Sequence, residues 1–408
     1  MLKIGVINKD EYGVMRNVYK RVHNGRCAYF ALESLDRRVI HKLGRIFNLN
    51  VGWQMSPGIV RSIMLDRSLF YVSPFADKNL EKVDLIHAWN QTCKTDKPWI
   101  VSLETKLPHC VDAEYGALTK AYTRYTSRRD LELIRKENCR KIICFCQNTY
   151  NELETSIKSI DKSAWDEVKN KTTVLIPPQR RLIGEQEIEE KFRGDDWRLV
   201  FIGGDFWIKG GVELILALKE LRKKHDFTLT LVSTMEIYHQ MVHNPYYSAD
   251  EIQTMRDMVR NEPWIQYHSK LDNRSVLKIM KRSHIGLFPS YGDTFGYVTL
   301  EMQASGCPVI TTDINALPEI NNNEVGWICN ITGTEPFEGV KAPRVRAILQ
   351  KQIADALDEA LSNRDLVIGK AVKAANRVER EFSEDEFSSK MYEIYSGALS
   401  DRQKGAGR

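Results

Sequence analysis

The chain has 408 residues, which is long enough for two domains with full-sized hydrophobic cores. Hydrophobic residues make up 42% and charged residues 28%, an ordinary globular composition, and no apolar run approaches the roughly 20 residues of a membrane-spanning helix. Residues 1–150 carry 25 Lys and Arg against 15 Asp and Glu, whereas the remainder carries 34 against 39. This asymmetry predicts that the two halves have different partners.

The first residues, MLKIGVINKDEYG, predict a strand over 2–7 and a loop over 8–13, without a signal-peptide pattern. Eight scattered cysteines have no metal-ligand spacing, so we expect reduced thiols in a cytoplasmic protein. Residues 34–47 and 120–136 each predict a row of basic side chains on a helix. These rows are either solvated helix faces or a peripheral contact with an anionic membrane. No nucleic-acid partner is expected, because no binding motif is present.

Residues 83–87 and 99–103 predict consecutive buried strands, and 141–145 predicts another. Glu104 directly follows the second of these strands, where ligands of parallel sheets bind, so it is either a candidate cleft residue or a surface carboxylate. His87 and His109 are alternative polar groups, and each alone is better explained as structural. The polar run over 179–196 predicts a linker, which places a domain boundary after residue 178.

The second half repeats the alternation of strand and helix. Residues 197–202 predict a strand, followed by a glycine-rich loop with Lys209 and a helix over 212–224. A strand over 227–233 precedes a loop over 235–247, and Ser248 with Glu251 predicts a capping box. A strand over 265–268 and a helix capped by Asn273 come next. Helices over 345–361 and at the end of the chain complete the pattern, and 401–408 predicts a frayed tail.

Residues 284–312 carry the most specific signal. They predict a strand (284–288), a polar loop (289–296), a helix (297–305) stopped by Gly306, and a strand (309–312). The loop meets the helix at residues 294–296, where backbone N–H groups and the helix dipole favour a phosphate or diphosphate. Asp293 precedes this junction, and Glu301 lies in the second turn of the helix. Glu301 is suited to accepting hydrogen bonds from neutral hydroxyls such as those of a ribose.

The run PSYGDTFGYVTLEMQASGCPVITTD resembles the acidic-x7-Glu signature of the retaining family-4 glycosyltransferases, which have the GT-B fold. Asp293 stands where the family usually has Glu, and Gln303 is a second departure. The loop before residue 212 resembles the family's strand-glycine-Lys-Gly-helix element, but its usual companion Arg is missing. The resemblance is strong over the second half of the chain and loose over the first half.

The resemblance implies an α/β protein of the GT-B class, with two Rossmann-like domains facing across a cleft and a C-terminal helix crossing back to the first domain. The expected parts are an acceptor-binding domain (1–178), a linker (179–196), a nucleotide-sugar domain (197–380), and the crossover helix and tail (381–408). The implied activity is metal-independent, retaining transfer of a hexosyl-type sugar from a UDP-sugar or GDP-sugar to a glycan or lipid-linked acceptor. No cofactor is implied.

The same resemblance, together with the positions argued above, assigns the candidate site. Lys209 would neutralise the departing diphosphate, and Asp293 and Glu104 would face the transferred sugar or the acceptor. The family's base-binding position corresponds to Tyr267 and His268. The full set of expected donor-binding residues is Gly13, Gly204, Asp205, Lys209, Tyr267, His268, Thr294, Phe295, Gly296, Thr299 and Glu301.

Two alternatives remain open at this point. The departures at Asp293, at Glu104 and at the missing Arg are compatible with a non-catalytic GT-B subunit that binds a nucleotide-sugar. A GT-B epimerase or a phosphorylase is the other class. Sugar-transfer assays, and product analysis in the absence of an acceptor, discriminate between them.

Overall fold

The computed structural model describes residues 1–7, 25–32, 71–72, 79–105, 117–237, 247–333, 340 and 342–400. The chain divides into two compact units, which are described separately. Unit 1 consists of Met1–Pro178 and Glu384–Arg408, and unit 2 is Gln179–Ser383. None of the described helices is both long enough and apolar enough to span a membrane.

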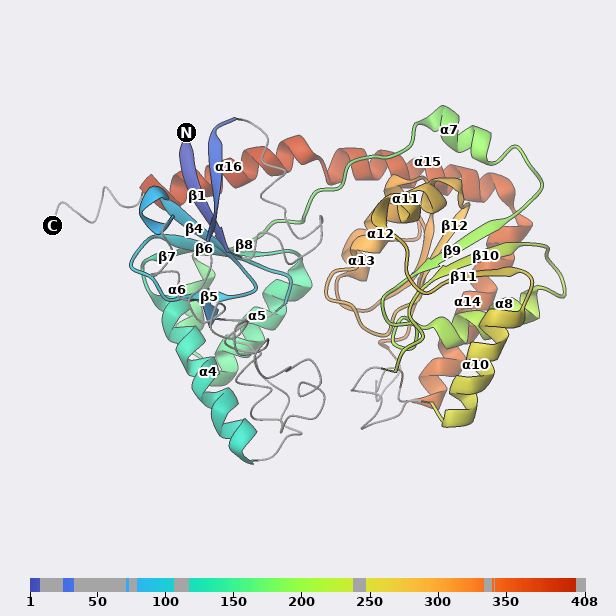
Figure 1. Ribbon diagram of the computed structural model, residues 1–408, viewed down its shortest axis with the longest axis horizontal. Helices are drawn as coiled ribbons and strands as arrows, with labels where there is room; N and C mark the ends of the chain where they lie inside the picture. Colours follow the sequence, from blue (N-terminus) through green and yellow to red (C-terminus); the bar gives the residue numbers. More distant parts are fainter. Residues whose placement is uncertain are drawn as a thin grey trace, which may run out of the picture. The chain divides into compact units, whose positions relative to one another are not determined.

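Unit 1 is built on a parallel six-stranded sheet (Figure 1). In spatial order its strands are β2 (Cys27–Leu32), β1 (Leu2–Ile7), β4 (Leu85–Trp89), β6 (Trp99–Leu103), β7 (Cys139–Cys144) and β8 (Thr172–Val174). A small parallel pair is formed by β3 (Tyr71–Val72) and β5 (Thr92–Cys93). Every residue of β4 and β6 is buried, as expected for inner strands of a sheet covered on both faces.

Helices cover both faces of this sheet. The described helices are η5 (Leu80–Lys82), α4 (Ala117–Arg135), α5 (Gln147–Ile160), α6 (Ala164–Lys169) and α16 (Glu384–Ser400). Apolar side chains of α4, α5 and α6 form one core with Ile86 and Ala88 of β4. The intervening residue, His87, points to the opposite face and meets Tyr395 of α16. The last helix of the chain is therefore an integral layer of unit 1.

Unit 2 has a second parallel six-stranded sheet, in the order β11-β10-β9-β12-β13-β14. Its strands are β9 (Arg198–Ile202), β10 (Thr228–Val232), β11 (Ile265–His268), β12 (Ile285–Phe288), β13 (Val309–Thr312) and β14 (Trp327–Cys329). Strand order reverses between β9 and β12, because β10 and β11 extend the sheet in one direction and β13 and β14 in the other. The crevice at the carboxyl ends of two such strands is where doubly wound folds bind ligands.

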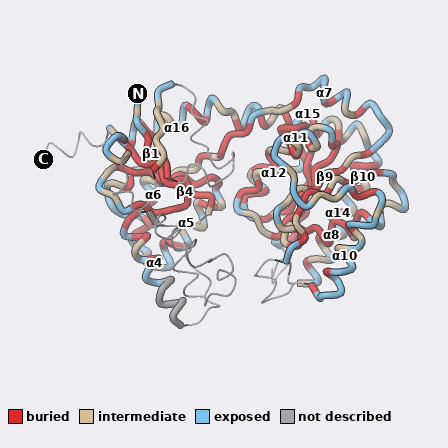
Figure 2. The backbone as a smooth tube through the Cα atoms, in the orientation of Figure 1, coloured by how far each residue is buried: buried red, intermediate tan, exposed pale blue. Residues whose placement is uncertain are grey.

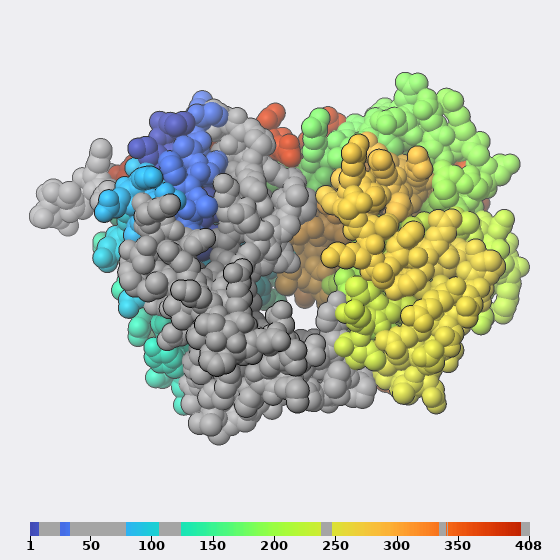
Figure 3. Space-filling view, viewed as in Figure 1, coloured from blue at the N-terminus to red at the C-terminus, as the bar shows by residue number. Residues whose placement is uncertain are grey.

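Eight helices of unit 2 are described. They are α7 (Glu185–Lys191), α8 (Gly211–Leu221), α10 (Ala249–Asn261), α11 (Asn273–Arg282), α12 (Tyr297–Ala304), α13 (Leu317–Ile320), α14 (Pro343–Ser362) and α15 (Arg364–Glu381). Helix α14 packs on α8, and α15 packs on α12 and α7. Figure 2 shows buried strands at the centre of each unit, with most helices exposing one side. On the viewer's side of unit 2, the yellow and orange segments α10 and α11 form much of the surface (Figure 3).

Several details differ from the sequence-based expectations. Strand β2 and helix α15 were not predicted. Asn273 does not cap α11; the cap is Asp272, whose carboxylate accepts a hydrogen bond from the Ser275 backbone N–H at 3.0 Å. The expected linker 179–196 contains α7, and its Ile188 is fully buried. The predicted helix over 34–47, Gly13, His109 and the tail 401–408 lie outside the described residues.

Candidate functional site

Two loops of unit 2 meet where the strand order reverses. One loop follows β9 and carries Lys209, and the other follows β12 and carries Asp293. The Tyr291 backbone N–H donates to the Ile208 carbonyl at 2.9 Å, which joins the two loops directly. The structure thus brings together two predicted site residues that are separated by 84 positions in the sequence.

Lys209 and Asp293 form an ion pair in this crevice. The Lys209 Nζ lies 2.6 Å from Asp293 Oδ2 and also donates to the Gly292 carbonyl at 2.6 Å. The side chains are 15% and 19% exposed, so the pair is largely withdrawn from water but can still be reached. The ammonium also lies 5.3 Å from the centre of the Phe288 ring. A bound anion would either contact the Lys209 ammonium together with Asp293 or displace Asp293 from it.

Gly210 sets how closely the two loops approach. Its φ is +72°, and a Cβ at this position would collide with the backbone carbonyl oxygen of Pro289. Only glycine allows both the left-handed backbone and this contact without strain. The position directly after Lys209 therefore fixes the spacing across which Lys209 reaches Asp293.

Gly296 is the N-cap residue of α12, has a φ of +84° and provides no side-chain cap. The other oxygen of Asp293, Oδ1, accepts from the Phe295 backbone N–H at 3.0 Å, and Asn315 donates to the Asp293 carbonyl at 2.8 Å. Asp293 is therefore held from both sides in front of the helix. Its two oxygens have different tasks, because one folds the loop and the other meets Lys209.

The remaining predicted donor-site residues have varied surroundings. Glu301 is half-buried on α12, whereas Thr299 is fully buried, so its side chain is turned into unit 2. Asp205 accepts from the backbone N–H groups of Trp207 and Ile208 at 3.1 and 3.2 Å, which makes it the residue that folds the turn before Lys209. Burial raises the pKa of Asp205 above its usual range. The Gly204 carbonyl accepts from the Thr234 hydroxyl at 2.8 Å.

Tyr267 and His268 end β11, two strands away from β9 in the sheet order. Both side chains are half-buried, and the His268 carbonyl accepts from the Ser233 backbone N–H at 3.0 Å. They lie at the carboxyl edge of the same sheet as Lys209 and Asp293, because all six strands run parallel. This is the edge where a nucleotide base would extend away from a diphosphate at β9 and β12.

Glu104 in unit 1 is 6% exposed and follows β6 as predicted. Its backbone N–H donates to the Asn90 side chain at 2.8 Å, and its carbonyl accepts from the Thr149 hydroxyl at 3.3 Å. Asn90 itself has a positive φ of 48°. The ends of β4 and β6 are thus tied together, so Glu104 has a fixed place at the carboxyl edge of the unit 1 sheet.

His87 is a structural residue of unit 1. It is buried, and its ring nitrogens lie 2.9 Å from the Tyr395 hydroxyl and 2.8 Å from the Ser102 hydroxyl. Burial lowers the pKa of His87 to about 3, so it stays neutral across the physiological range. It joins β4, β6 and α16 and has no free nitrogen for a substrate.

A buried polar cluster behind the two loops was missed in the sequence. Glu213, in the first turn of α8, is 2% exposed, and the Tyr247 hydroxyl donates to its Oε1 at 3.1 Å. Arg346 of α14 lies 3.9 Å from Glu213 Oε1 and 4.6 Å from the centre of the Tyr247 ring. Burial raises the pKa of Glu213 to about 7. The available signal was one carboxylate within the apolar run VELILAL, which places Glu213 on the core side of the helix.

Burial also raises the pKa of the Tyr291 hydroxyl, and the charge of Glu213 raises it further. Tyr291 belongs to the same loop as Asp293. The cluster of Glu213, Tyr247 and Arg346 therefore acts on the loop that presents Asp293.

Comparison with solved structures defines the class of fold. The crystal structure of Anabaena Alr3699/HepE in complex with UDP and glucose superimposes with a TM-score of 0.60 at 12% identity, covering 97% of this chain and 100% of that one. Sucrose-phosphate synthase from Thermosynechococcus elongatus gives a TM-score of 0.60 at 13% identity over 100% of both chains. The fold is that of the GT-B glycosyltransferases, with two Rossmann-like domains.

Sequence comparison shows which proteins the second half of the chain is similar to. Residues 196–338 match the family model described as glycosyl transferases group 1. Glycogen synthase from Mycobacterium tuberculosis is 26% identical over 162 residues, which are 40% of this chain and 34% of that protein. CapM of Staphylococcus aureus, a capsular polysaccharide biosynthesis glycosyltransferase, is 22% identical over 253 residues, covering 57% of this chain and 63% of that protein. The chain spans about a third of the length of the first curated relatives that it matches.

Proposed function

We propose that the protein is a retaining, family-4-type glycosyltransferase that moves a sugar from a nucleotide-diphosphate-sugar to a glycan or lipid-linked acceptor. The observation that carries the proposal is the pairing of Lys209 with Asp293 at the strand-order reversal, within the residues that match glycosyl transferases group 1. This is the crevice where the fold class favours a nucleotide. The ion pair keeps a cation and a carboxylate side by side in front of α12.

Each residue would then have a distinct task. Lys209 and the backbone at the start of α12 compensate the negative charge that develops on the departing diphosphate, without a bound metal. When the diphosphate engages Lys209, Asp293 Oδ2 becomes available to sugar hydroxyls or to positive charge building on the ring. Glu301 accepts hydrogen bonds from the ribose, and Tyr267 and His268 contact the base. Glu104 contributes a carboxylate from unit 1 to the sugar or the acceptor.

The acceptor would be a glycan or a lipid-linked sugar of cell-surface polysaccharide synthesis, taken up by unit 1. The name of the relative CapM and the basic balance of residues 1–150 support this assignment. A protein of this kind would work in the cytoplasm, in peripheral contact with the anionic face of the membrane. The donor would be a UDP-sugar or a GDP-sugar, and no further cofactor takes part.

The first test identifies the donor. Thermal unfolding is followed with UDP, GDP, ADP and their common sugars, with EDTA and with added metal, because a ligand of the folded state raises the midpoint by mass action. One nucleotide family should raise the midpoint, and EDTA should leave that rise unchanged.

The second test addresses the site. With the donor identified, Lys209→Ala should lower kcat/KM roughly a hundredfold, since a donor to developing negative charge is lost. Lys219→Ala, an exposed lysine on α8, is the matched control and should retain activity. Wild-type turnover in Lys209→Ala would show that the diphosphate lies elsewhere.

A second candidate function is a non-catalytic GT-B subunit that binds a nucleotide-sugar. It is favoured by the low positive charge available to a diphosphate at this site. Lys209 is paired with Asp293, and the usual companion Arg of the family is missing, since the residue before Lys209 is Ile208. Such a subunit would show the nucleotide-dependent rise in midpoint without any transfer. Product analysis at high protein concentration, with and without an acceptor, separates this function from the transferase and from an epimerase.

A further inference from the structure

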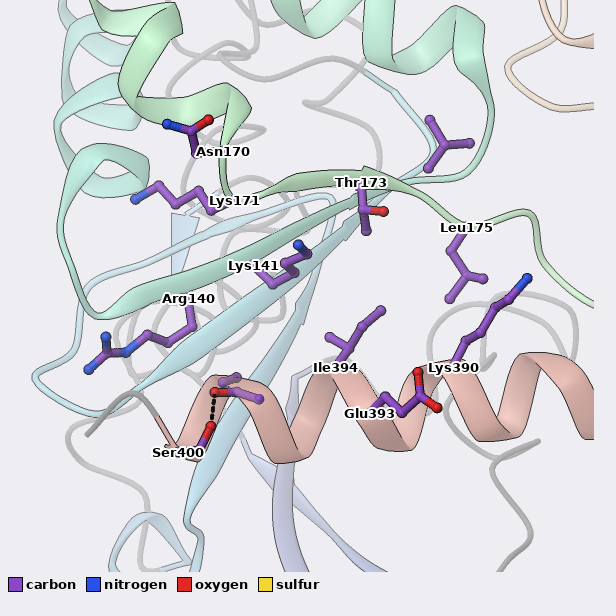
Figure 4. Close-up of a pocket in the computed structure, with 13 residues that line it drawn as sticks. Arg140, Lys141, Asn170, Lys171, Thr173, Leu175, Lys390, Glu393, Ile394 and Ser400 are labelled. Carbon is purple, nitrogen blue, oxygen red and sulfur yellow. Dashed lines mark hydrogen bonds between the residues drawn. The ribbon is translucent and has the colours of Figure 1, made fainter. Parts of the chain in front are cut away.

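Unit 1 contains a groove of about 620 Å³ between the edge strand β8 and helix α16. Figure 4 shows Lys141 and Thr173 on the strands and Lys390, Glu393 and Ile394 along the helix beneath them. The volume falls within the roughly 300–1,000 Å³ of small-molecule sites. None of its lining residues is among the candidate donor-site residues.

Most of the charged side chains that line the groove are positive. Arg140, Lys141, Lys171 and Lys390 line it, and Glu393 is the only carboxylate among its lining residues. Within the described part of the chain, neither Arg140 nor Lys141 has a carboxylate within ion-pair distance. The Nε atom of Arg140 is shielded from solvent and has no hydrogen-bond partner among the described residues. An anion in the groove would compensate charge that the protein itself leaves unbalanced.

Two of these cations are already partly engaged. Lys171 donates to the Lys136 carbonyl at 3.0 Å, and burial lowers its pKa. Lys390 pairs with Glu386 one turn earlier on α16 at 2.6 Å. We therefore assign the anion position to the sheet side. Lys141 has no carboxylate partner within the described residues, and Lys171 lies next to it across β7 and β8, where the Ile142 backbone N–H donates to the Lys171 carbonyl at 2.8 Å. The end of α16 near Ser400 presents carbonyl groups and disfavours negative charge.

Apolar side chains line the rest of the groove on both of its sides. Val174 and Leu175 contribute from β8 and the residue after it, and Ile394 and Ala398 contribute from α16. Ile394 and Ala398 are four residues apart and therefore lie on the same side of the helix. A ligand that fills the groove would meet cations on the sheet side and hydrocarbon along Ile394 and Ala398 of α16.

From this arrangement we propose that the groove binds a phosphorylated amphiphile. Its phosphate lies at Lys141 and Lys171, and its apolar part lies along Ile394 and Ala398. This goes beyond sugar transfer and assigns unit 1 a second ligand site, formed in part by the last helix of the chain. The same chemistry occurs in a membrane phospholipid and, for the anionic part alone, in free phosphate.

The test uses three probes on the full chain, measured by calorimetric titration below the micelle concentration. These are dihexanoyl phosphatidic acid, dihexanoyl phosphatidylcholine and inorganic phosphate. The phosphatidic acid should bind saturably and at least about tenfold more tightly than either other probe, since each tenfold corresponds to a single good interaction. Equal binding of inorganic phosphate would overturn the apolar half of the proposal, and equal binding of phosphatidylcholine would overturn the ionic half.

Variants then locate the site. Lys141→Gln combined with Lys171→Gln should weaken phosphatidic acid binding by about tenfold or more. Lys162→Gln, an exposed lysine between α5 and α6 outside the groove, is the control and should bind as the parent does. Because Lys171 is partly buried, Lys141→Gln alone is measured as well, and it should also weaken binding. Undiminished binding in folded Lys141→Gln, or equal loss in Lys162→Gln, would overturn the proposal.

Discussion

Glu213 is a carboxyl group held away from water directly behind the candidate donor loops. Its usual pKa of 4.5 is raised to about 7, chiefly by burial, and the Tyr247 hydroxyl and Arg346 only partly oppose this. Between these two pH values the folded protein retains a proton that the unfolded chain has released. The free energy of unfolding must therefore fall as the pH rises from about 4.5 to 7, because the native state binds more protons.

Glu213→Gln should remove this dependence. Gln keeps an oxygen for the Tyr247 hydroxyl but does not titrate. Relative to wild type, the variant should gain roughly 2–3 kcal/mol of unfolding free energy between pH 5 and pH 8, in proportion to the shift in pKa. Urea denaturation of both proteins at pH 5 and pH 8 measures this difference in unfolding free energy. Glu220→Gln, exposed on the same helix, is the control, and identical pH profiles for the Glu213 variant and wild type would contradict the assignment.

Gly210→Ala tests the approach of the two loops. A side chain there would meet both the left-handed backbone and the Pro289 carbonyl, so we expect a loss of at least about 2 kcal/mol in unfolding free energy. Gly204→Ala, in the same loop but with open space around the added atom, should cost less than about 0.5 kcal/mol. Denaturant midpoints compare the two variants, and equal losses would mean that the close approach is not what requires glycine.

Sequence reasoning at this scale identified Lys209 and Asp293 individually, from motif positions. It could not predict that they pair, because an ion pair across 84 residues depends on which strands become neighbours. Glu213 was missed for a different reason. A glutamate in a helix usually lies on the solvated face, and only its tertiary partners Tyr247 and Arg346 show that it is buried.

At the scale of elements, α7 connects parts of unit 2 that the sequence did not suggest were related. Lys191, the last residue of α7, donates to the carbonyls of Ser283, Ser305 and Gly306 at 2.9, 3.2 and 2.7 Å. Ser283 caps the C-terminus of α11, and Ser305 caps the C-terminus of α12. One ammonium thus satisfies the otherwise unpaired ends of two helices, including the helix that starts at the candidate donor site.

Lys191→Met should therefore destabilise unit 2. The variant keeps the aliphatic length but loses three charge-assisted hydrogen bonds and leaves carbonyls unsatisfied, for which we expect a loss of about 2–4 kcal/mol. Glu190→Gln, exposed on the same short helix, should have little effect. Chemical denaturation followed by tryptophan fluorescence measures both. A loss below about 1 kcal/mol in Lys191→Met would mean that water replaces the ammonium at these carbonyls.

Elements were predicted well where the local signal was complete. Strands over 2–7, 99–103, 265–268 and 309–312 have the predicted bounds. Each is rich in apolar, β-branched or aromatic residues and is bounded by polar or turn-forming residues. Helix α15 was missed because half of its buried residues are alanine and one is Lys370, which leaves a weak apolar stripe. Helix α7 was also missed, because most of its residues are charged and no apolar stripe marks it. Its one buried residue is Ile188, and the helix packs on α15.

For the whole molecule, the path of the chain matters as much as the two sheets. Unit 2 is one continuous segment, whereas unit 1 is completed by residues that follow unit 2. Helix α16 contributes Phe387, Met391, Tyr395 and Ala398 to the interior of unit 1. Tyr395 is fully buried and provides the partner of His87. Unit 1 therefore lacks one of its helical layers until residues 384–400 have been synthesised.

This chain path predicts an asymmetry between fragments. Residues 179–383 contain a complete sheet with both helical layers, so this fragment should unfold cooperatively and retain the proposed nucleotide binding. Residues 1–178 alone lack α16 and should be unstable, because burying three large apolar side chains contributes about 5 kcal/mol and the uncovered His87 loses a partner.

Joining 384–400 to residue 178 through a flexible linker should restore folding. Circular-dichroism melts compare the fragments, with a linked version carrying Tyr395→Ala and Met391→Ala as the matched control. If 1–178 unfolds with the same midpoint as the linked fragment, α16 is an accessory to unit 1 and not one of its layers.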